Sequence, residues 1–411
     1  MGAEVMPATL VSLLTWDRAP PTLVLMTAAA TDLPAAPGSP SAAAVYEHLV
    51  RRGPHARTDL AAVLGLSHPT LTRLARELLE NGLLRELPPR PQAKGRPQLP
   101  LDVAEEHVRL IGVKITATAV HTSVVTVRGQ SLEELAAPLR RKDPDAVIAT
   151  VTELCEALRS SHPRIAGVGI GLGGRVDDDG VVAPAELLGW EGPVPLRERL
   201  EQALGLPVSV RNDIHALLEG LAWFGAGRRH DSFVAITVGA GVAVGTVEGG
   251  VVRRGAGHTA GLTGALTTVT RDGRGVRLMD VACNDAVIEA GRERGVPGAG
   301  TGTPEQRLQA VLDAVRAGDP AARELAAEVG HAVAVSAAGV LGVLDPEALL
   351  LGGESVGLLR DDPAFAETLR ALLPAQQQDV VVRYLPDDFE DWARGAAVIA
   401  ARRFITGTGP V

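Results

Sequence analysis

Three short turns of small residues each follow an apolar stretch that is predicted to be a β-strand, and they are the first candidates for chemistry. They lie at Thr116–Thr118, Gly239–Gly241 and Gly352–Gly353. Small residues at a strand end let backbone N–H groups approach an anion, so such turns commonly hold a phosphate. The first turn departs from this pattern, because Lys114 precedes it where a carboxylate often stands. Lys114, which adds a positive charge, and Thr118, which ends the turn, are therefore candidate anion contacts.

A second group of candidates surrounds the predicted strand "PVSVRND", which ends in Asn212 and Asp213. An Asn-Asp pair at a strand end most often caps the following helix, although its side chains could also bind a ligand. His258, in the loop "GAGHTAG", could donate to a ligand hydroxyl or be an ordinary solvated histidine. Arg211 could pair with an acid across a cleft, and His215 is expected to face solvent.

The segment 43–100 predicts a small DNA-reading head. "AAVYEHLVRRG" and "ARTDLAAVLGL" are helical stretches that stop at glycines, and "SHPTLTRLARELLENGLL" is a third, with Ser67 as its N-cap. The leucines of this third helix form one apolar stripe and leave a polar face. Two helices joined by a tight turn describe a helix-turn-helix, whose second helix would lie in the major groove. The side chains of this helix expected to contact DNA are Ser67, His68, Thr70, Thr72, Arg73 and Arg76.

The stretch "LLRELPPRPQAKGRPQLPLDV" predicts a two-stranded wing with Lys94 and Arg96 at its tip, where they would contact phosphate or the minor groove. Residues 41–100 hold nine Lys/Arg against five Asp/Glu, an excess of positive charge in a chain whose net charge is −9. A basic module on an acidic body fits a DNA-binding head. The alternative is a small helical interaction domain with ordinary surface arginines.

Composition limits the class of protein further. A chain of 411 residues, 46% of them hydrophobic, exceeds one typical domain and can bury a sizeable core. Its two cysteines, Cys155 and Cys283, are too few for a disulfide framework or a cysteine metal cluster, and they suit a reducing cytoplasm. No apolar run reaches ~18 residues, so no membrane span is expected. Residues 1–42 are predicted to be a disordered leader.

After residue 105 the predicted strands and helices alternate. "VRLIGVKI" and "AVHTSVVTV" predict a hairpin, "IAGVGIGLGG" a buried strand, and "SFVAITVGAGVAVGTVEGGVV" two strands followed by a Gly-Gly hairpin. Helical sequence runs from about 278 to 344, and "FEDWARGAAVIAARRF" predicts a closing helix. The pattern indicates an α/β fold with a mixed sheet in two similar halves around a cleft. The three turns, in this order, narrow it to the actin-like sugar-kinase architecture.

From about residue 43 to 404 the chain resembles the ROK family, which is named for repressors, open reading frames and sugar kinases. The resemblance is carried by "GVGIGLGGRVDDDG", "LLGWEGPVPLRERLEQALGLPVSVRNDIHALLEG", "FGAGRRHDSFVAITVGAGVAVGTVEGG", "DPEALLLGGESV" and, for the repressor branch, the head with "GRPQLPLDV". It implies a winged helix-turn-helix followed by an actin-like, ribonuclease-H-like two-lobed fold. In the family's kinases the Asn-Asp pair binds sugar and the aspartate takes a proton from the attacking hydroxyl. The resemblance therefore makes Asp213 the position of the base, and Gly174, Asn212, Asp213 and His258 the expected ligand-binding residues.

Three departures from the family pattern predict that phosphotransfer is lost. The family's Asp-x-Gly-x-Thr turn begins here with Lys114, and a lysine cannot ligate Mg²⁺. The sugar-binding glutamate is replaced by Leu262 and the zinc-binding histidine by Ala265, with no cysteine-rich motif after it. No cofactor and no metal are therefore expected, and the acidic run 177–179 is expected to be a solvated turn.

These observations predict four parts: a leader at 1–42, a winged helix-turn-helix at 43–104, a kinase-like body at 105–405 and a tail at 406–411. Within the body, the first lobe would take 105–215 and the closing helix 389–405, and the second lobe 216–388. The favoured hypothesis is a cytoplasmic transcriptional regulator, a repressor of carbohydrate-related genes. It would bind a palindromic double-stranded DNA operator as a homodimer or homotetramer, with a sugar or sugar-phosphate effector. The alternatives are an ATP-dependent sugar kinase, and a regulator that responds to a phosphorylated or non-sugar effector or to a partner protein.

Overall fold

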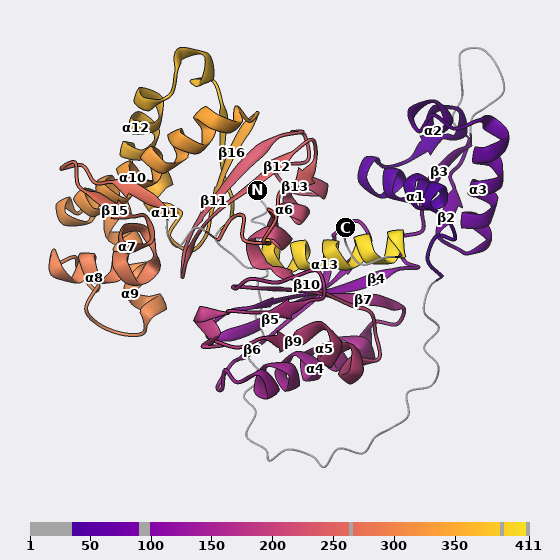
Figure 1. Ribbon diagram of the computed structural model, residues 1–411, viewed down its shortest axis with the longest axis horizontal. Coiled ribbons are helices and arrows are strands. Elements are labelled where there is room, and N and C mark those ends of the chain that lie inside the picture. Colours follow the sequence, from indigo (N-terminus) through magenta and orange to yellow (C-terminus); the bar gives the residue numbers. More distant parts are fainter. Residues whose placement is uncertain (1–34, 90–98, 263–265, 387–389, 408–411) are drawn as a thin grey trace, which may run out of the picture. The chain divides into compact units, whose positions relative to one another are not determined.

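Two five-stranded sheets organise the part of the chain that follows residue 105 (Figure 1). The computed structural model describes residues 35–89, 99–262, 266–386 and 390–407. Lys94, Arg96 and Ala265, which the sequence singled out, lie outside the described residues.

The first sheet has the strand order β10-β7-β4-β5-β6. Its strands are β4 (Arg109–Ile115), β5 (Ala119–Thr126), β6 (Ser131–Pro138), β7 (Ile165–Leu172) and β10 (Val208–Asn212). β4, β7 and β10 run parallel, whereas β5 and β6 are antiparallel to their neighbours. Because parallel strands end at the same edge of a sheet, the residues that follow β4, β7 and β10 meet there, and ligands commonly bind at such an edge.

Helices cover both faces of this sheet. α4 (Pro144–Ser161) and α5 (Leu196–Leu204) pack on one face, and α13 (Glu390–Thr406) crosses the other, between the sheet and α6 (Asp213–Trp223) (Figure 1). The close approach of α13 requires glycines. A Cβ added to Gly112 would lie 1.8 Å from the carbonyl oxygen of Ala393, and one added to Gly169 would lie 1.7 Å from that of Ala396.

The second sheet has the order β13-β12-β11-β16-β17. Its strands are β11 (Phe233–Val238), β12 (Val242–Glu248), β13 (Val251–Val252), β16 (Ala348–Gly352) and β17 (Val381–Tyr384). α6 packs against β12, so this helix contacts both sheets. On the other face lies a second core, formed with α7 (Met279–Ala282), α8 (Asn284–Glu293), α9 (Pro304–Ala317), α10 (Pro320–Leu344), α11 (Gly357–Arg360) and α12 (Ala364–Leu372).

α10 is the one described helix whose length and composition would suit a membrane span, although Arg323, Glu324 and Glu328 interrupt its apolar residues. The helix carries a core face instead, because side chains such as Val329 and Val333 are fully buried among the helices of the second half. Such a buried apolar helix is common in the core of a large domain.

The described residues between 40 and 103 form three helices and a small antiparallel sheet. The helices are α1 (Pro40–Arg52), α2 (Arg57–Val63) and α3 (His68–Glu80), and the sheet has the order β1-β3-β2, from β1 (His55–Ala56), β2 (Leu84–Glu86) and β3 (Pro100–Val103). The expected cap of α3 is confirmed, since the Ser67 hydroxyl accepts from the Thr70 N–H at 3.3 Å. The buried residues of α3 are Leu71, Leu74, Ala75 and Leu78, so the predicted leucine stripe is confirmed except at Leu79, which is only partly buried.

The expected hairpin β4–β5, the strands β11–β13 and the closing helix α13 are confirmed. Several elements were not expected, namely β6, the short pairs β8 (Val181–Val182) with β9 (Val194–Pro195) and β14 (Thr267–Val269) with β15 (Gly275–Arg277), and β17. Residues 33–411 group into one compact unit, and the predicted boundaries within it stay predictions.

Candidate functional site

The end of β4 and the start of α6 bring Lys114 against Asp213. The Lys114 ammonium donates to Asp213 Oδ2, and the two side chains are only 8% and 20% exposed. The Lys114 Nζ also lies 4.3 Å from the ring centroid of Trp392, which belongs to α13. Lys114 thus has a carboxylate on one side and an aromatic ring on another. His121 lies opposite Lys114 on β5. Burial and, second, the positive charge of Lys114 lower the pKa of His121.

Asn212 is the N-cap of α6. Its Oδ1 accepts from the Ile214 N–H at 3.0 Å, and its Nδ2 donates to the Gly174 carbonyl at 2.9 Å. The side chain is almost completely buried, so the backbone uses both ends of the amide. Gly174 has φ +138°, and a Cβ there would lie 2.6 Å from the Pro184 oxygen, so this position requires glycine. The structure brings Gly174, Asn212 and Asp213 together, and their predicted role in ligand binding stays a prediction.

The described loop residues that follow β13 are held by α6. His215 is buried and its Nε2 donates to the Ala260 carbonyl at 2.6 Å, so the expectation that His215 faces solvent is wrong. Burial is the main cause that lowers the pKa of His215, because the charged ring would lose its water. His258, in the same loop, has φ +57°, a conformation that few residues other than glycine adopt.

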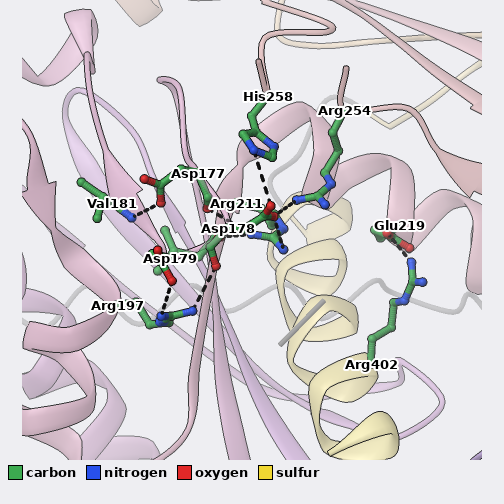
Figure 2. Close-up of polar contacts among 11 residues, drawn as sticks. Asp177, Asp178, Asp179, Val181, Arg197, Arg211, Glu219, Arg254, His258 and Arg402 are labelled. Carbon is green, nitrogen blue, oxygen red and sulfur yellow. Dashed lines mark hydrogen bonds and ion pairs between the residues drawn. The ribbon is translucent and has the colours of Figure 1, made fainter. Parts of the chain in front are cut away.

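Asp178 joins this loop to the turn after β7 (Figure 2). Its carboxylate accepts from Arg254 at 2.8 Å and lies 3.5 Å from His258 Nε2 and 3.7 Å from Arg211. The hydrogen bond from Arg254 is the largest cause that lowers the pKa of Asp178. Burial, and then repulsion by Arg254, lower the pKa of Arg211 to about 10. Arg211 therefore pairs with an acid, Asp178, but this acid follows the neighbouring strand β7 of the same sheet and does not lie across a cleft as expected.

The other two acids of this turn have local partners. Asp177 Oδ1 accepts from the Val181 N–H at 2.9 Å, and Asp179 lies 3.3 Å from Arg197 (Figure 2). Asp178 and Asp179 are mostly exposed, as expected of a solvated turn, although the ion pairs of Asp178 were not foreseen. Across the described ranges, no group of three or more His, Cys, Asp or Glu side chains is arranged to hold a metal ion.

The remaining predicted positions are Thr118, Leu262 and the start of α3. Thr118 is exposed in the turn after β4, and its N–H donates to Thr116 Oγ1 at 3.3 Å. Leu262 pairs with Ala243 in an isolated bridge and is 36% exposed. On α3, a shallow hollow is lined by His68, Pro69, Thr72, Arg73 and Arg76.

Residues 110–402 match the sequence pattern described as "ROK family". This match covers well over half of the chain. The protein belongs to the ROK family.

Individual relatives of this ROK protein include regulators and kinases. It is 24% identical to the DNA-binding transcriptional repressor Mlc of Escherichia coli, over 87% of this chain and 92% of that protein. It is 27% identical to a glucokinase of Halalkalibacterium halodurans, over 59% of this chain and 79% of that protein. Among solved structures, it superposes on a ROK family transcriptional regulator, a homologue of the E. coli Mlc protein, with a TM-score of 0.73 at 22% identity. That likeness covers 89% of this chain and 96% of the other and shows the fold.

Against this family background, the main residues missed from the sequence are Trp392 and Arg254. Each contacts a residue that the sequence did single out, Lys114 in one case and Asp178 in the other. Trp392 carried a weak signal, since it is one of four tryptophans and begins the closing helix. Arg254 carried no such signal. Nothing in the sequence distinguishes it from the other loop residues, and its partner Asp178 lies 76 positions away.

Proposed function

We propose that this ROK protein is a DNA-binding transcriptional regulator, a repressor of carbohydrate-related genes, whose kinase-like body senses an effector. The observation that carries the proposal is the ion pair between Lys114 and Asp213. A general base must be free to take a proton from a substrate hydroxyl, and here an ammonium occupies the carboxylate. The same lysine removes the acid that would organise Mg²⁺. The relatedness to Mlc supports the choice of a regulator over an enzyme.

The head supplies the DNA-binding half of the proposal. We take α2, α3 and the β2–β3 pair as a winged helix-turn-helix, with α3 in the major groove. The exposed hollow lined by His68, Thr72, Arg73 and Arg76 presents hydrogen-bond donors and positive charge at the start of that helix. A homodimer or homotetramer would set two such helices about 34 Å apart on a palindromic operator. The protein would work in the cytoplasm, where DNA and sugar effectors meet.

Binding to fragments upstream of its own gene tests the proposal. Fluorescence anisotropy should show a preference for one fragment over random DNA of equal length. Arg73→Ala and Arg76→Ala should each weaken specific binding by about tenfold, and loss of a phosphate contact should also reduce the slope of log affinity against log salt by about one. Arg323→Ala, which removes an exposed arginine from α10, is the matched control and should change neither. Equal affinity for every fragment would contradict the proposal.

A sugar kinase is the second candidate, and the glucokinase relative together with the retained Asn212–Asp213 pair favours it. Incubation with ATP, Mg²⁺ and a panel of hexoses, with ADP release as the readout, separates the two. The pairing of Asp213 predicts no hexose-dependent ADP release. Release that depends on one hexose would establish the kinase.

The remaining alternative is a regulator whose effector is phosphorylated or is not a sugar, or whose signal is a partner protein. Calorimetry with free sugars and sugar phosphates, on the wild type and on Lys114→Asp, tests the anionic effector. Stronger binding of sugar phosphates that is lost in Lys114→Asp would assign Lys114 and Thr118 to an anion. Equal binding by both proteins would remove Lys114 from that role.

A further inference from the structure

The first phosphate-type turn, between β4 and β5, is closed by one of its own side chains. Thr116 Oγ1 accepts from the N–H of Thr118 at 3.3 Å and from the N–H of Ala119 at 2.9 Å, and donates to the Ala119 carbonyl at 3.0 Å. N–H groups at such a strand end are those that would otherwise reach an anion. In this chain the Thr116 hydroxyl oxygen accepts the hydrogen bonds of these N–H groups.

The second turn, Gly239–Gly241 between β11 and β12, is also bonded from within. The Gly239 N–H donates to the Gly241 carbonyl at 3.0 Å, and the Asn284 N–H donates to the Gly239 carbonyl at 2.7 Å. In the amide orientation that satisfies its neighbours, the Asn284 side chain accepts from the Ala240 N–H at 3.1 Å. Two of the turn's three N–H groups are therefore committed to the chain itself.

A carboxylate lies directly on this second turn. β16 runs parallel to β11 and ends beside it, with Gly352 opposite Thr237. Gly353 has φ +94°, and a Cβ there would lie 2.3 Å from the Val238 oxygen, so the two turns touch. Glu354 follows, and a Cβ added to Gly239 would lie 1.8 Å from Glu354 Oε2. Only a glycine at 239 allows the carboxylate oxygen to approach the backbone this closely.

The segment that carries Glu354 is fixed in place. The Ser355 N–H donates to the Val238 carbonyl at 3.0 Å, and the Ser355 side chain contacts the side chain of Asn284 at 2.7 Å. Ser355 itself is fully buried. Glu354 therefore lies between Gly353 and Ser355, both of which contact Val238 at the end of β11.

We propose that this chain fills both of its phosphate-binding turns itself, with the Thr116 hydroxyl at the first and the Glu354 carboxylate at the second, so that the cleft takes its effector without a nucleotide. A nucleotide phosphate at the second turn would meet a like charge and backbone donors that are already bonded. The second turn keeps its shape because Gly353 packs against Val238 at the end of β11 and Gly239 leaves room for Glu354. Glu354 thereby acts as a specificity-determining residue that excludes phosphate.

Isothermal titration of the full chain with ADP and Mg²⁺, and separately with pyrophosphate, tests this inference. The wild type should bind both weakly or not at all. Glu354→Gln keeps the size of the side chain and removes its charge, so it should bind at least about tenfold more tightly. Combining it with Thr116→Gly, which frees the N–H groups of the first turn, should strengthen binding further. Glu367→Gln, which changes an exposed glutamate on α12, is the matched control and should behave as the wild type.

One result would overturn the inference. It is a Glu354→Gln variant that keeps its circular dichroism and unfolding midpoint and binds ADP within about twofold of the wild type. DNA binding measured on the same preparations reports on the proposed function separately, because neither Thr116 nor Glu354 belongs to the head.

Discussion

At the scale of single residues, Lys114 and Asp213 depend on each other. Both side chains are mostly buried, so removal of one partner leaves the other's charge without compensation in a poorly hydrated place. The Trp392 ring stabilises the ammonium and has no equivalent interaction with a carboxylate. The pair should therefore contribute to stability as a unit rather than as the sum of two residues.

A double-mutant cycle tests this coupling. Lys114→Met keeps the apolar stem and leaves the Asp213 carboxylate unpaired, so the free energy of unfolding should fall by about 2–3 kcal/mol. Asp213→Asn on top of Lys114→Met should restore at least about 1 kcal/mol, because the unpaired charge is gone. The measurement is urea unfolding followed by circular dichroism. Strictly additive losses would show that the two side chains do not depend on each other.

The sequence could identify both members of this pair but not their contact. Lys114 was singled out because it replaces an expected acid, and Asp213 because it ends a strand beside an asparagine. The two are 99 positions apart, and only the parallel register of β4, β7 and β10 brings them to one edge of the sheet. We expected Lys114 to contact the anionic group of a ligand, and instead it contacts the carboxylate of Asp213. The spacing of the two residues along the chain does not reveal this contact.

At the scale of elements, the loop that contains Arg254 and His258 is held by α6, by the turn after β7 and by β12, which pairs with it at Leu262. α6 holds it through His215 and Ala260, and the turn after β7 holds it through Asp178. The second tie links elements that belong to different sheets. It rests on an exposed carboxylate, so it is weaker and easier to open than the buried one.

Hydrogen exchange measures this tie. Asp178→Asn should speed amide exchange in residues 253–262 by several-fold, because Arg254 and His258 lose their shared acceptor. Asp179→Asn is the matched control, since Asp179 pairs with Arg197 of its own half and should leave the loop unchanged. Unchanged exchange in the Asp178→Asn loop would show that α6 and β12 hold the loop without Asp178.

The pH dependence of the same exchange has a definite sign. The folded protein holds the pKa of Asp178 below its ordinary value of 3.8, so the tie is present above that value and is lost as the pH falls through the lowered one. His258, Arg254 and Arg211 are the charged or titratable groups paired with Asp178. Exchange rates corrected for intrinsic pH effects should stay constant from about pH 7 to about pH 5. Opening of the loop within that range would contradict this assignment.

β6 shows why some elements escaped the sequence. Its residues "SLEELAAP" are mostly good helix formers, and they follow a Gly-Gln turn rather than a run of β-branched residues. The strand forms because β5 offers it an open edge, and its exposed and partly buried positions alternate as a sheet edge requires. By contrast, β7 and β11 are fully buried apolar runs and were recognised. Local propensity therefore identified the apolar strands β7 and β11 and missed β6, whose formation depends on pairing with β5.

At the scale of the whole molecule, Arg128 links the body to the head. It follows β5 and donates to the Leu49 carbonyl of α1 at 3.0 Å, to Glu105 at 2.6 Å and to the buried Asp102 of β3. Burial alone would lower the pKa of Arg128, but the hydrogen bonds to Asp102 and Glu105 outweigh it and raise that pKa. A second arginine, Arg228, donates to the Arg51 carbonyl at 2.8 Å. The last carbonyls of α1 are thus bonded by the first sheet and by the α6–β11 connection.

This arrangement makes the end of α1 the place where a change in the body would reach the head. Arg128 touches α1, β3 and the connection after it at once, so its removal should loosen all three together. Its removal also leaves the Asp102 carboxylate, 6% exposed, with the more exposed Arg85 at 3.5 Å as its remaining ion-pair partner among the described residues. The head should therefore lose up to about 3 kcal/mol of stability while the cores of the two sheets keep theirs.

Arg128→Ala should accordingly raise amide exchange in residues 42–52 and 100–105 and leave β7 and β11 unchanged, as followed by hydrogen exchange and mass spectrometry. Arg253→Ala removes an exposed arginine whose partner, Glu248, is equally exposed, and it should change neither region. Specific DNA affinity of Arg128→Ala should fall by less than that of Arg73→Ala, because the residue supports the head without facing the groove. A head whose exchange is the same with and without Arg128 would show that signals from the body reach DNA by another route.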